Sequence, residues 1–475
     1  MEKAQFGMIG LGTMGRNLVL NMADHGFRVC GYDRNVDQQK RLLEEGKDKP
    51  VQAAASMQEL IDSLEHPRRI MMLVPAGKIT DAVIDEASAL LQPGDILIDG
   101  GNSHFRDTDA RIARLAATGI HYTGMGVSGG EDGARLGPSL MPGGQESGYH
   151  ELKNILEKIA AQTSEGACVT FVGNGSAGHY TKMVHNGIEY AIMQLLSEAY
   201  AVLKNVGGCS NQELHEIFTR WNEGALQSFL VEITAKIFLQ PDDKLPANQL
   251  LDAILDRAAQ KGTGMWTSNS ALELHVPTPT IDEAVAARDL SSYKKERILI
   301  DAFTSAEPVN IGDAASKATL LKDLEDAVYF GIAVSYVQGL HLLQTASLAY
   351  KYGINIAEVV RIWKGGCIIR SAMLNDIGQP YTETPDLLNL LLNESFYKKL
   401  QEKRTAVTGI IKIAMDHRIG MPALGSSLFY VDMFGTGRSG SNLIQAQRDY
   451  FGAHTYERTD EEGNFHTTWV LPSQP

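Results

Sequence analysis

The sequence predicts an α/β amino-terminal domain with a doubly wound, mostly parallel sheet, followed by a large all-helical domain. Short apolar runs alternate with helical patterns over residues 1–177, as in parallel α/β sheets. A glycine-rich turn follows the first apolar run and opens a helical pattern. From residue 178 to residue 434, long helical patterns dominate and strand signals fade. We therefore expect one domain at residues 1–177 and a second at residues 178–434.

Six apolar runs are expected to form the sheet. They are Phe6–Ile9, Arg28–Tyr32, Ile70–Val74, Ile96–Asp99, Ile120–Thr123 and Val169–Val172. Helical patterns lie between most of them, which favours parallel strands joined by crossover helices.

The helical region contains an internal repeat. The segment LHEIFTRWNEGALQSFLVEI around Trp221 resembles IAEVVRIWKGGCIIRSAMLNDI around Trp363, and each follows a long helical pattern and a glycine-containing break. We expect two copies of one helical unit. Because the polar stripe described below occurs in the first copy alone, we expect the second copy to be structural and to contribute to a dimer surface.

The last segment, residues 435–475, is predicted to be a tail. It begins with the breaker-rich run GTGRSGS, continues with a short helical pattern and ends in a polar, turn-rich stretch. A segment of this length cannot bury a hydrophobic core of its own.

Composition narrows the classes of function. The chain has 475 residues, 44% of them hydrophobic and 21% charged, with a formal net charge of −14. The negative charge argues against a general nucleic-acid binder or a membrane-surface binder, and no apolar run is long enough to span a membrane. The four cysteines fit no metal-binding spacing, and the sequence begins without a signal peptide, so we expect a cytoplasmic protein with reduced thiols.

The glycine-rich turn predicts a dinucleotide site of the Rossmann type. Gly10 permits a tight turn, Gly12 lets the backbone approach a pyrophosphate, and Gly15 lets the helix pack on the strand. Free N–H groups at the helix amino terminus then favour the anion. Asp33, after the second strand, can accept hydrogen bonds from the free ribose diol of NAD, whereas Arg34 can pair with the 2′-phosphate of NADP. Asp33 and Arg34 therefore do not decide between NAD and NADP.

A polar stripe on an otherwise apolar helix predicts the active site. Lys182, His185, Asn186, Glu189 and Tyr190 fall at i, i+3, i+4, i+7 and i+8, and therefore on one helical face. A solvated face usually carries several charged residues, whereas this one combines a base, an acid, an amide and a phenol. We expect these side chains to perform chemistry.

Two further motifs end predicted strands, where doubly wound folds bind their ligands. Asn102 lies in the run DGGNS, and Ser128, Gly129 and Gly130 lie in the run VSGG, whose N–H groups and hydroxyl suit a carboxylate. Four isolated basic residues have the character of surface residues when taken one by one: Lys261, Arg288, Arg448 and His454.

Taken together, these motifs resemble those of the 6-phosphogluconate dehydrogenase family almost from end to end. The most specific are IDGGNS, GVSGGEDGARLGPSLMPGG, KMVHNGIEY, QKGTG and QRDYFGAHTYER, in this order. The resemblance implies a Rossmann domain, a helical domain with a duplicated half, and a homodimer in which the tail enters the partner subunit. It also implies NADP as cofactor and 6-phosphogluconate as substrate, with no nucleic-acid or membrane partner.

The resemblance assigns roles residue by residue. It surrounds the sugar acid with Asn102, Ser128, Gly129, Gly130, Lys182, His185, Asn186 and Glu189. It gives the 6-phosphate to Tyr190, Lys261 and Arg288, together with Arg448 and His454 of the other subunit. It gives the cofactor Gly10, Leu11, Gly12, Thr13, Met14, Gly15, Asp33, Arg34, Asn35, Val74, Pro75, Ala76 and Asn102. The run Asp33-Arg34-Asn35 departs from the Asn-Arg-Thr or Asn-Arg-Ser of NADP-type members, so NAD use is expected alongside NADP.

On this assignment, Lys182 accepts the proton of the substrate's 3-hydroxyl, because burial on an apolar helix lowers the pKa of a lysine. Glu189 protonates C1 of the enediol after loss of CO2. We find no carboxylate cluster suited to a divalent metal and expect none. The alternatives are a non-decarboxylating β-hydroxyacid dehydrogenase, which lacks the repeat and the tail, and an inactive nucleotide-binding homologue, which loses Lys182 or Glu189.

Overall fold

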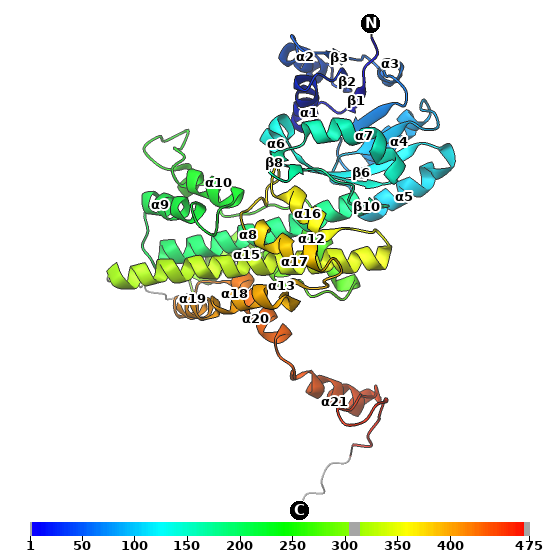
Figure 1. Ribbon diagram of the computed structural model, residues 1–475. Coiled ribbons are helices and arrows are strands. Elements are labelled where there is room, and N and C mark those ends of the chain that lie inside the picture. Colours follow the sequence, from blue (N-terminus) through cyan, green and yellow to red (C-terminus); the bar gives the residue numbers. More distant parts are fainter. Residues whose placement is uncertain (1, 304–313, 470–475) are drawn as a thin grey trace, which may run out of the picture. The chain divides into compact units, whose positions relative to one another are not determined.

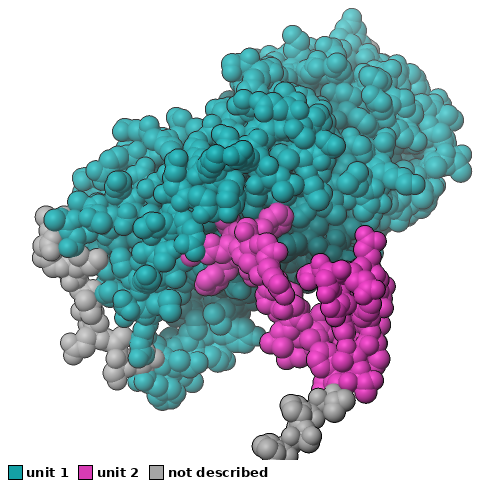
Figure 2. All heavy atoms as spheres, turned by 60° about the horizontal axis from the view of Figure 1, so that its bottom comes forward, with its two compact units in different colours: residues 1–427 teal, residues 428–475 magenta. Residues whose placement is uncertain are grey.

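The computed structural model describes residues 2–303 and 314–469. The chain divides into two compact units, residues 1–427 and residues 428–475 (Figure 2). No described helix is long and apolar enough to cross a membrane.

An eight-stranded sheet forms the amino-terminal part, in the order β10-β7-β6-β5-β4-β1-β2-β3 (Figure 1). Its strands are β1 Phe6–Ile9, β2 Val29–Tyr32, β3 Val51–Ala53, β4 Arg69–Met72, β5 Ile96–Asp99, β6 His121–Ser128, β7 Ser139–Gly144 and β10 Gly173–Asn174. Every pair is parallel except β6 with β7. The predicted doubly wound, mostly parallel sheet is confirmed.

Five of the six predicted strands are confirmed within a few residues, and the prediction for residues 169–172 is wrong. That segment contributes only an isolated bridge between Val169 and Leu140, and the pairing passes to β10. Strands β3, β7 and β10 were not predicted. Strand β7 contains Pro142, which has no N–H to donate, so its sequence reads as a turn rather than as a strand.

Helices cover both faces of the sheet. They are α1 Thr13–Asp24, α2 Val36–Glu45, α3 Met57–Asp62, α4 Lys78–Ser88, α5 Phe105–Leu115, α6 Gly130–Leu136 and α7 Glu146–Ile159, with a 3-10 turn at Ala116–Thr118 and a small hairpin, β8 Gln162–Thr163 and β9 Gly166–Ala167. Side chains of β5 alternate between two apolar clusters: Ile96 and Ile98 pack with α1 and α7, and Leu97 packs with α3 and α4.

Two long helices, α8 Ala177–Asn205 and α15 Ala314–Tyr350, run side by side through the helical part (Figure 1). Around them lie α9 Asn211–Asn222, α10 Phe229–Phe238, α11 Leu250–Ala253, α12 Thr263–Glu273, α13 Pro279–Ser291, α14 Lys294–Asp301, α16 Ile356–Trp363, α17 Leu374–Glu383, a 3-10 turn at Leu390–Leu392, α18 Glu394–Gln401, α19 Arg404–Asp416 and α20 Pro422–Phe434. Helix α8 also packs on β6 and β7. Residues 1–427 therefore form one unit, and the domain boundary at residue 177 stays a prediction.

The internal repeat has a structural counterpart. Trp221 ends α9 and Trp363 ends α16, both are buried, and each helix follows one of the two long helices. An antiparallel bridge between Ser228 and Ser371 joins the segments that follow. The arrangement supports two copies of one helical unit.

Candidate active site

The polar stripe lies on the first half of α8, inside the molecule. Lys182, His185 and Asn186 are buried, and the side chain of Glu189 is 22% exposed. Helix α8 is enclosed here because α12, α13, α15 and strands β6 and β7 all pack against it. The stripe is therefore no solvated surface, and its polar groups must satisfy one another or a ligand.

His185 connects α8 to the end of β6. Its Nε2 lies 3.2 Å from the hydroxyl oxygen of Ser128, and its Nδ1 lies 3.5 Å from Lys182 Nζ and 3.2 Å from Asn186 Oδ1. Burial holds the pKa of His185 well below its usual value, and the charge of Lys182 lowers it further. The imidazole is therefore neutral and serves as a hydrogen-bonding group.

Lys182 and Glu189 have pKa values shifted in opposite directions. Burial lowers the pKa of Lys182 and raises the pKa of Glu189, and the attraction between the two partly offsets both shifts. Each shift favours the uncharged form, in which lysine can accept a proton and glutamic acid can donate one. The direction of the pKa shift at Lys182 agrees with the prediction, and two oppositely shifted groups lie on one helical face.

Helices α12 and α13 form one wall. Asn186 Nδ2 donates to Thr263 Oγ1 at 3.2 Å, and Thr267 Oγ1 donates to the carbonyl of Met183 at 2.9 Å. The guanidinium carbon of Arg288 lies 3.4 Å from the centroid of the Tyr190 ring. Tyr190 and Arg288, which the resemblance assigns to one site, are thus brought together by a cation–π contact. Lys261 lies exposed in the loop before α12.

The glycines after β6 allow another segment to approach closely. Gly129 has a φ of +122°, and a Cβ placed on it would lie 2.6 Å from the carbonyl oxygen of Gly366. That oxygen follows α16, whose Trp363 ring stands edge-on to His185 with centroids 5.5 Å apart. The second copy of the repeat therefore forms the wall behind Ser128, Gly129 and His185.

Asn102 lies at the exposed end of a loop that a buried network holds in place. Asp99 Oδ2 accepts hydrogen bonds from Ser103 at 2.6 Å, Tyr122 at 3.0 Å and Arg111 at 3.3 Å. The carbonyl of Asp99 lies 3.0 Å from Nε2 of His179, one turn before Lys182 on α8. Asp99 and Ser103 belong to the predicted DGGNS motif, whereas Arg111, Tyr122 and His179 were not predicted.

The cofactor motif has the predicted geometry. Gly10 has a φ of +91°, a Cβ on Gly15 would lie 2.0 Å from the carbonyl oxygen of Gly10, and a Cβ on Gly12 would meet open space. Asp33 Oδ2 accepts from the N–H of Leu11 at 2.7 Å, and Oδ1 accepts from the N–H of Asn35 at 2.8 Å. Space above Gly12, at the start of α1, is what a bound pyrophosphate requires, so these residues fit a dinucleotide.

A mostly apolar cleft of about 300 Å³ continues from this turn. Its lining comprises Ile9, Gly10, Gly12, Tyr32, Asp33, Arg34, Met57, Leu73, Val74, Pro75, Ile79, Val83 and Glu86. Thr13 and Met14 open α1 beside it, Asn35 caps α2, and Ala76 follows Pro75 outside the lining. Glu86, which the sequence did not single out, is bonded to Arg34 at 2.9 Å.

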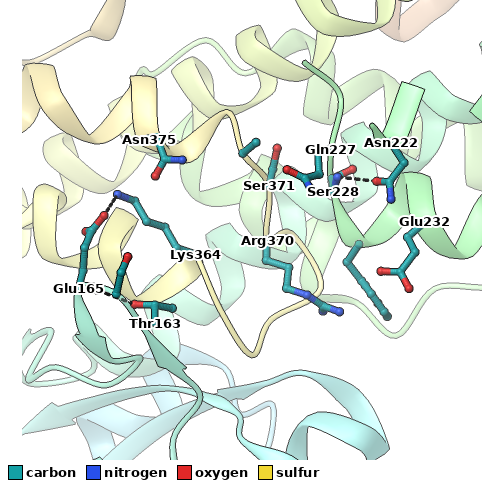
Figure 3. Close-up of a pocket in the computed structure, with 13 residues that line it drawn as sticks. Thr163, Glu165, Asn222, Gln227, Ser228, Glu232, Lys364, Arg370, Ser371 and Asn375 are labelled. Carbon is teal, nitrogen blue, oxygen red and sulfur yellow. Dashed lines mark hydrogen bonds and ion pairs between the residues drawn. The ribbon is translucent and has the colours of Figure 1, made fainter. Parts of the chain in front are cut away.

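A second cleft, strongly polar, contains none of the predicted site residues (Figure 3). It lies between the β8–β9 hairpin, the start of α10 and the segment after α16. Its cations are already engaged, since Lys364 pairs with Glu165 and Arg370 stacks on the ring of Phe229 at 3.9 Å. We assign no function to this cleft. Across the described ranges, no group of three or more His, Cys, Asp or Glu side chains could hold a metal ion.

The tail residues belong to the second compact unit. Helix α21 Ser441–Gly452 carries Arg448, which is exposed and donates to Gln445 at 2.9 Å. His454 is exposed beside the ring of Phe451. Asp449 is buried within the unit and accepts from the N–H groups of Thr455 and Thr467 and from the indole of Trp469. The tail thus has its own hydrogen-bonded order, which was not predicted.

Comparisons with known proteins agree over the whole chain. Residues 5–173 match the family model of the NAD binding domain of 6-phosphogluconate dehydrogenase, and residues 178–469 match that of its C-terminal domain. The decarboxylating 6-phosphogluconate dehydrogenase of Synechococcus elongatus is 48% identical over 99% of this chain and 100% of its own. The NADP(+)-dependent decarboxylating enzyme of Bacillus subtilis is 46% identical over the same shares.

A solved structure gives the same result. The 6-phosphogluconate dehydrogenase of Plasmodium falciparum, studied in its apo form and with NADP+ and 6-phosphogluconate, has a TM-score of 0.94 at 41% identity, covering 98% of this chain and 100% of its own. The chain belongs to the 6-phosphogluconate dehydrogenase family.

Proposed function

We propose that this chain is an NADP-dependent enzyme that oxidises and decarboxylates 6-phospho-D-gluconate to D-ribulose 5-phosphate and CO2, as in the pentose phosphate pathway. The observation that carries the proposal is the pair Lys182 and Glu189, one group poised to accept a proton and the other to donate one. The names of the relatives support the same substrate and cofactor. Four free, buried cysteines support a cytoplasmic setting.

Lys182 performs the first proton transfer. Its neutral amine takes the proton of the 3-hydroxyl, and a nicotinamide held in the cofactor cleft would supply the oxidant that removes hydride from C3. The product of this step is a 3-keto acid, whose carboxylate lies β to the carbonyl. Lys182, now an ammonium, returns its proton to O3 as the C1–C2 bond breaks and CO2 leaves, and no step requires a metal.

Glu189 performs the second transfer. The enediol left by CO2 loss becomes the ketose when its terminal carbon gains a proton and O3 loses its own, which the neutral amine of Lys182 takes back. Because burial raises the pKa of Glu189, this carboxyl carries a proton at a pH where an exposed glutamate does not. Neutral His185 and Asn186 hold substrate hydroxyls beside it.

The remaining residues bind and orient the substrate. Ser128, Gly129 and Gly130 at the end of β6, with Asn102 from the neighbouring loop, surround the carboxylate end. Tyr190 and Arg288 hold the 6-phosphate with Lys261, which reaches it from the loop before α12. An arginine stacked on a ring presents its N–H groups edgewise, which suits a phosphate.

Parallel rate measurements with NAD and NADP on 6-phosphogluconate test the proposed function. We expect nucleotide reduction and CO2 release at equal rates, the faster turnover with NADP, and no loss of activity with a chelator. Nucleotide reduction without CO2 would indicate a non-decarboxylating β-hydroxyacid dehydrogenase. No reduction at all would indicate an inactive homologue.

Asp33→Asn is expected to raise the ratio of kcat/KM for NADP to that for NAD, because the carboxylate repels a 2′-phosphate. The amide keeps one oxygen acceptor, so the variant retains one of the two bonds to the N–H groups of Leu11 and Asn35. Asp37→Asn is the matched control, since its carboxylate lies on α2 paired with Lys40, and we expect it to change the ratio by less than about twofold. A wild-type enzyme that rejects NAD by more than about 10⁴-fold, roughly 5.5 kcal/mol, would contradict this account.

We also propose that the protein is a homodimer whose tail completes the partner's site. Within its own unit, α21 buries only Asp449 and exposes Leu443, Ile444, Tyr450 and Phe451. A helix of 12 residues is only marginally stable without a surface to cover its apolar side. Arg448 supplies the additional cation that a dianionic phosphate needs in an acidic protein.

Mixing two inactive variants, Lys182→Met and Arg448→Ala, is expected to restore activity after subunit exchange. Each heterodimer then contains one site with both residues intact, so random exchange gives about one quarter of the wild-type rate. Rates are measured before and after exchange, and sedimentation confirms that the species are dimers. Exchange without recovery would place each tail in the site of its own subunit.

A further inference from the structure

An ion pair lies beside the end of the cofactor cleft that contains Asp33. Arg34 follows β2 and Glu86 lies near the end of α4, and both side chains line the cleft together with Asp33. Arg34 Nη2 lies 2.9 Å from Glu86 Oε2. The side chain of Arg34 is 70% exposed and that of Glu86 is 38% exposed, so a ligand entering the cleft can reach the pair.

The carboxylate of Glu86 lies against Arg34 where an anionic group of a ligand would bind. Its contact with Arg34 has the length of a charge-assisted hydrogen bond, which is also the contact that an oxygen of a 2′-phosphate makes with an arginine. Arg34 has no hydrogen bond to Asp33, whose two oxygens accept the N–H groups of Leu11 and Asn35. The one arginine at this end of the cleft therefore already has a carboxylate partner.

The two cofactors differ in what they require of this pair. A free ribose diol leaves the bond between Arg34 and Glu86 intact and can approach Asp33. A 2′-phosphate has to share or displace Arg34 from Glu86, and it then lies between two carboxylates, those of Glu86 and Asp33. Removal of the Glu86 carboxylate frees the guanidinium of Arg34 and also removes the repulsion between Glu86 and the 2′-phosphate.

We propose that Glu86 is a cofactor-selectivity residue, which holds Arg34 and so restrains the preference for the 2′-phosphorylated cofactor. The inference rests on the proposed function in one respect, namely that this cleft binds the adenosine half of a nicotinamide dinucleotide. Glu86 takes no part in the reaction, and its effect is on selectivity alone.

The test compares the equilibrium binding of two probes to wild type and to Glu86→Gln. Adenosine 2′,5′-bisphosphate carries the 2′-phosphate and 5′-AMP lacks it, so calorimetry with both isolates that group. We expect the variant to bind the bisphosphate about tenfold more tightly, because loss of the exposed Arg34–Glu86 pair and loss of the repulsion between Glu86 and the 2′-phosphate each contribute up to roughly fivefold. We expect it to bind 5′-AMP within about twofold of wild type. The ratio of kcat/KM for NADP to NAD should rise by the same factor.

Asp85→Asn is the matched control. It removes the same charge one residue earlier on α4, where the carboxylate pairs with Arg114 at 3.0 Å outside the cleft. Its probe affinities should stay within about twofold of wild type. Bisphosphate binding that is unchanged in Glu86→Gln, or weakened because Glu86 positions Arg34 for the phosphate, would overturn the inference. Absence of turnover on 6-phosphogluconate would instead overturn the proposed function, while the probes would still report on Glu86.

Discussion

A Lys182→Met variant is expected to fold, to bind NADP and to lose turnover by at least about 10³-fold. Methionine matches the length of the buried lysine stem and removes an amine that burial already disfavours in its charged form. The fold should therefore tolerate the change, while the 3-hydroxyl loses the group that accepts its proton. Initial rates measure the chemical loss, and calorimetric titration with NADP verifies that the cofactor site is intact.

The same variant distinguishes a double role for Lys182 from a single one. A supplied 3-keto acid analogue bypasses oxidation, and Lys182→Met should still fail to decarboxylate it, because O3 lacks its proton donor. In the wild type, kcat/KM should increase with pH through an apparent pKa below the usual range of lysine, since the free amine is the active form. Near-normal turnover of the variant, or wild-type activity abolished by a chelator, would contradict the role of Lys182.

Glu189→Gln is expected to slow the overall reaction by about 10²–10⁴-fold with little change in KM. The amide preserves the size of the side chain and its contacts, but it cannot deliver a proton to C1 of the enediol. In deuterated water the wild type should place deuterium at C1 of ribulose 5-phosphate with fixed stereochemistry. Loss of that stereochemistry in the variant would locate the defect at the protonation step.

Glu198→Gln provides the matched control for this effect. Glu198 lies on the same helix, is buried, and accepts the N–H groups of Ala423 and Leu424 at the start of α20. Its replacement removes a buried carboxylate from α8 without touching the stripe, so C1 protonation should keep its stereochemistry. Wild-type turnover in Glu189→Gln would reduce Glu189 to a binding residue.

Local patterns predicted the elements whose periodicity is strong. The five confirmed strands are apolar runs buried on both faces of the sheet, and α8 has a stripe with helical spacing. The glycine-rich cofactor turn was predictable because the local geometry of the backbone requires each of its glycines. Strand β7 was missed because Pro142 and two glycines are typical of turns rather than of strands. The run at residues 169–172 was mistaken for a strand because it is apolar, although it forms only an isolated bridge.

Supporting residues could not be predicted because tertiary pairing alone defines them. His179 reaches the carbonyl of Asp99 across 80 positions of the chain, and Arg34 reaches Glu86 across 52. No periodicity links such partners. The direction of the pKa shift at Lys182 was predictable, since an apolar helix implies burial. The roles of Arg448 and His454 stay predictions, because they depend on a second copy of the chain.

The wall that Gly366 and Trp363 build behind Gly129 and His185 bears on how a duplicated protein diverges. The second helical copy lacks the polar stripe of the first, yet the backbone of Gly366 packs against Gly129 and the ring of Trp363 packs against His185. A shortened enzyme that keeps only the first copy would retain every proton-transfer group and still lack an enclosed chamber.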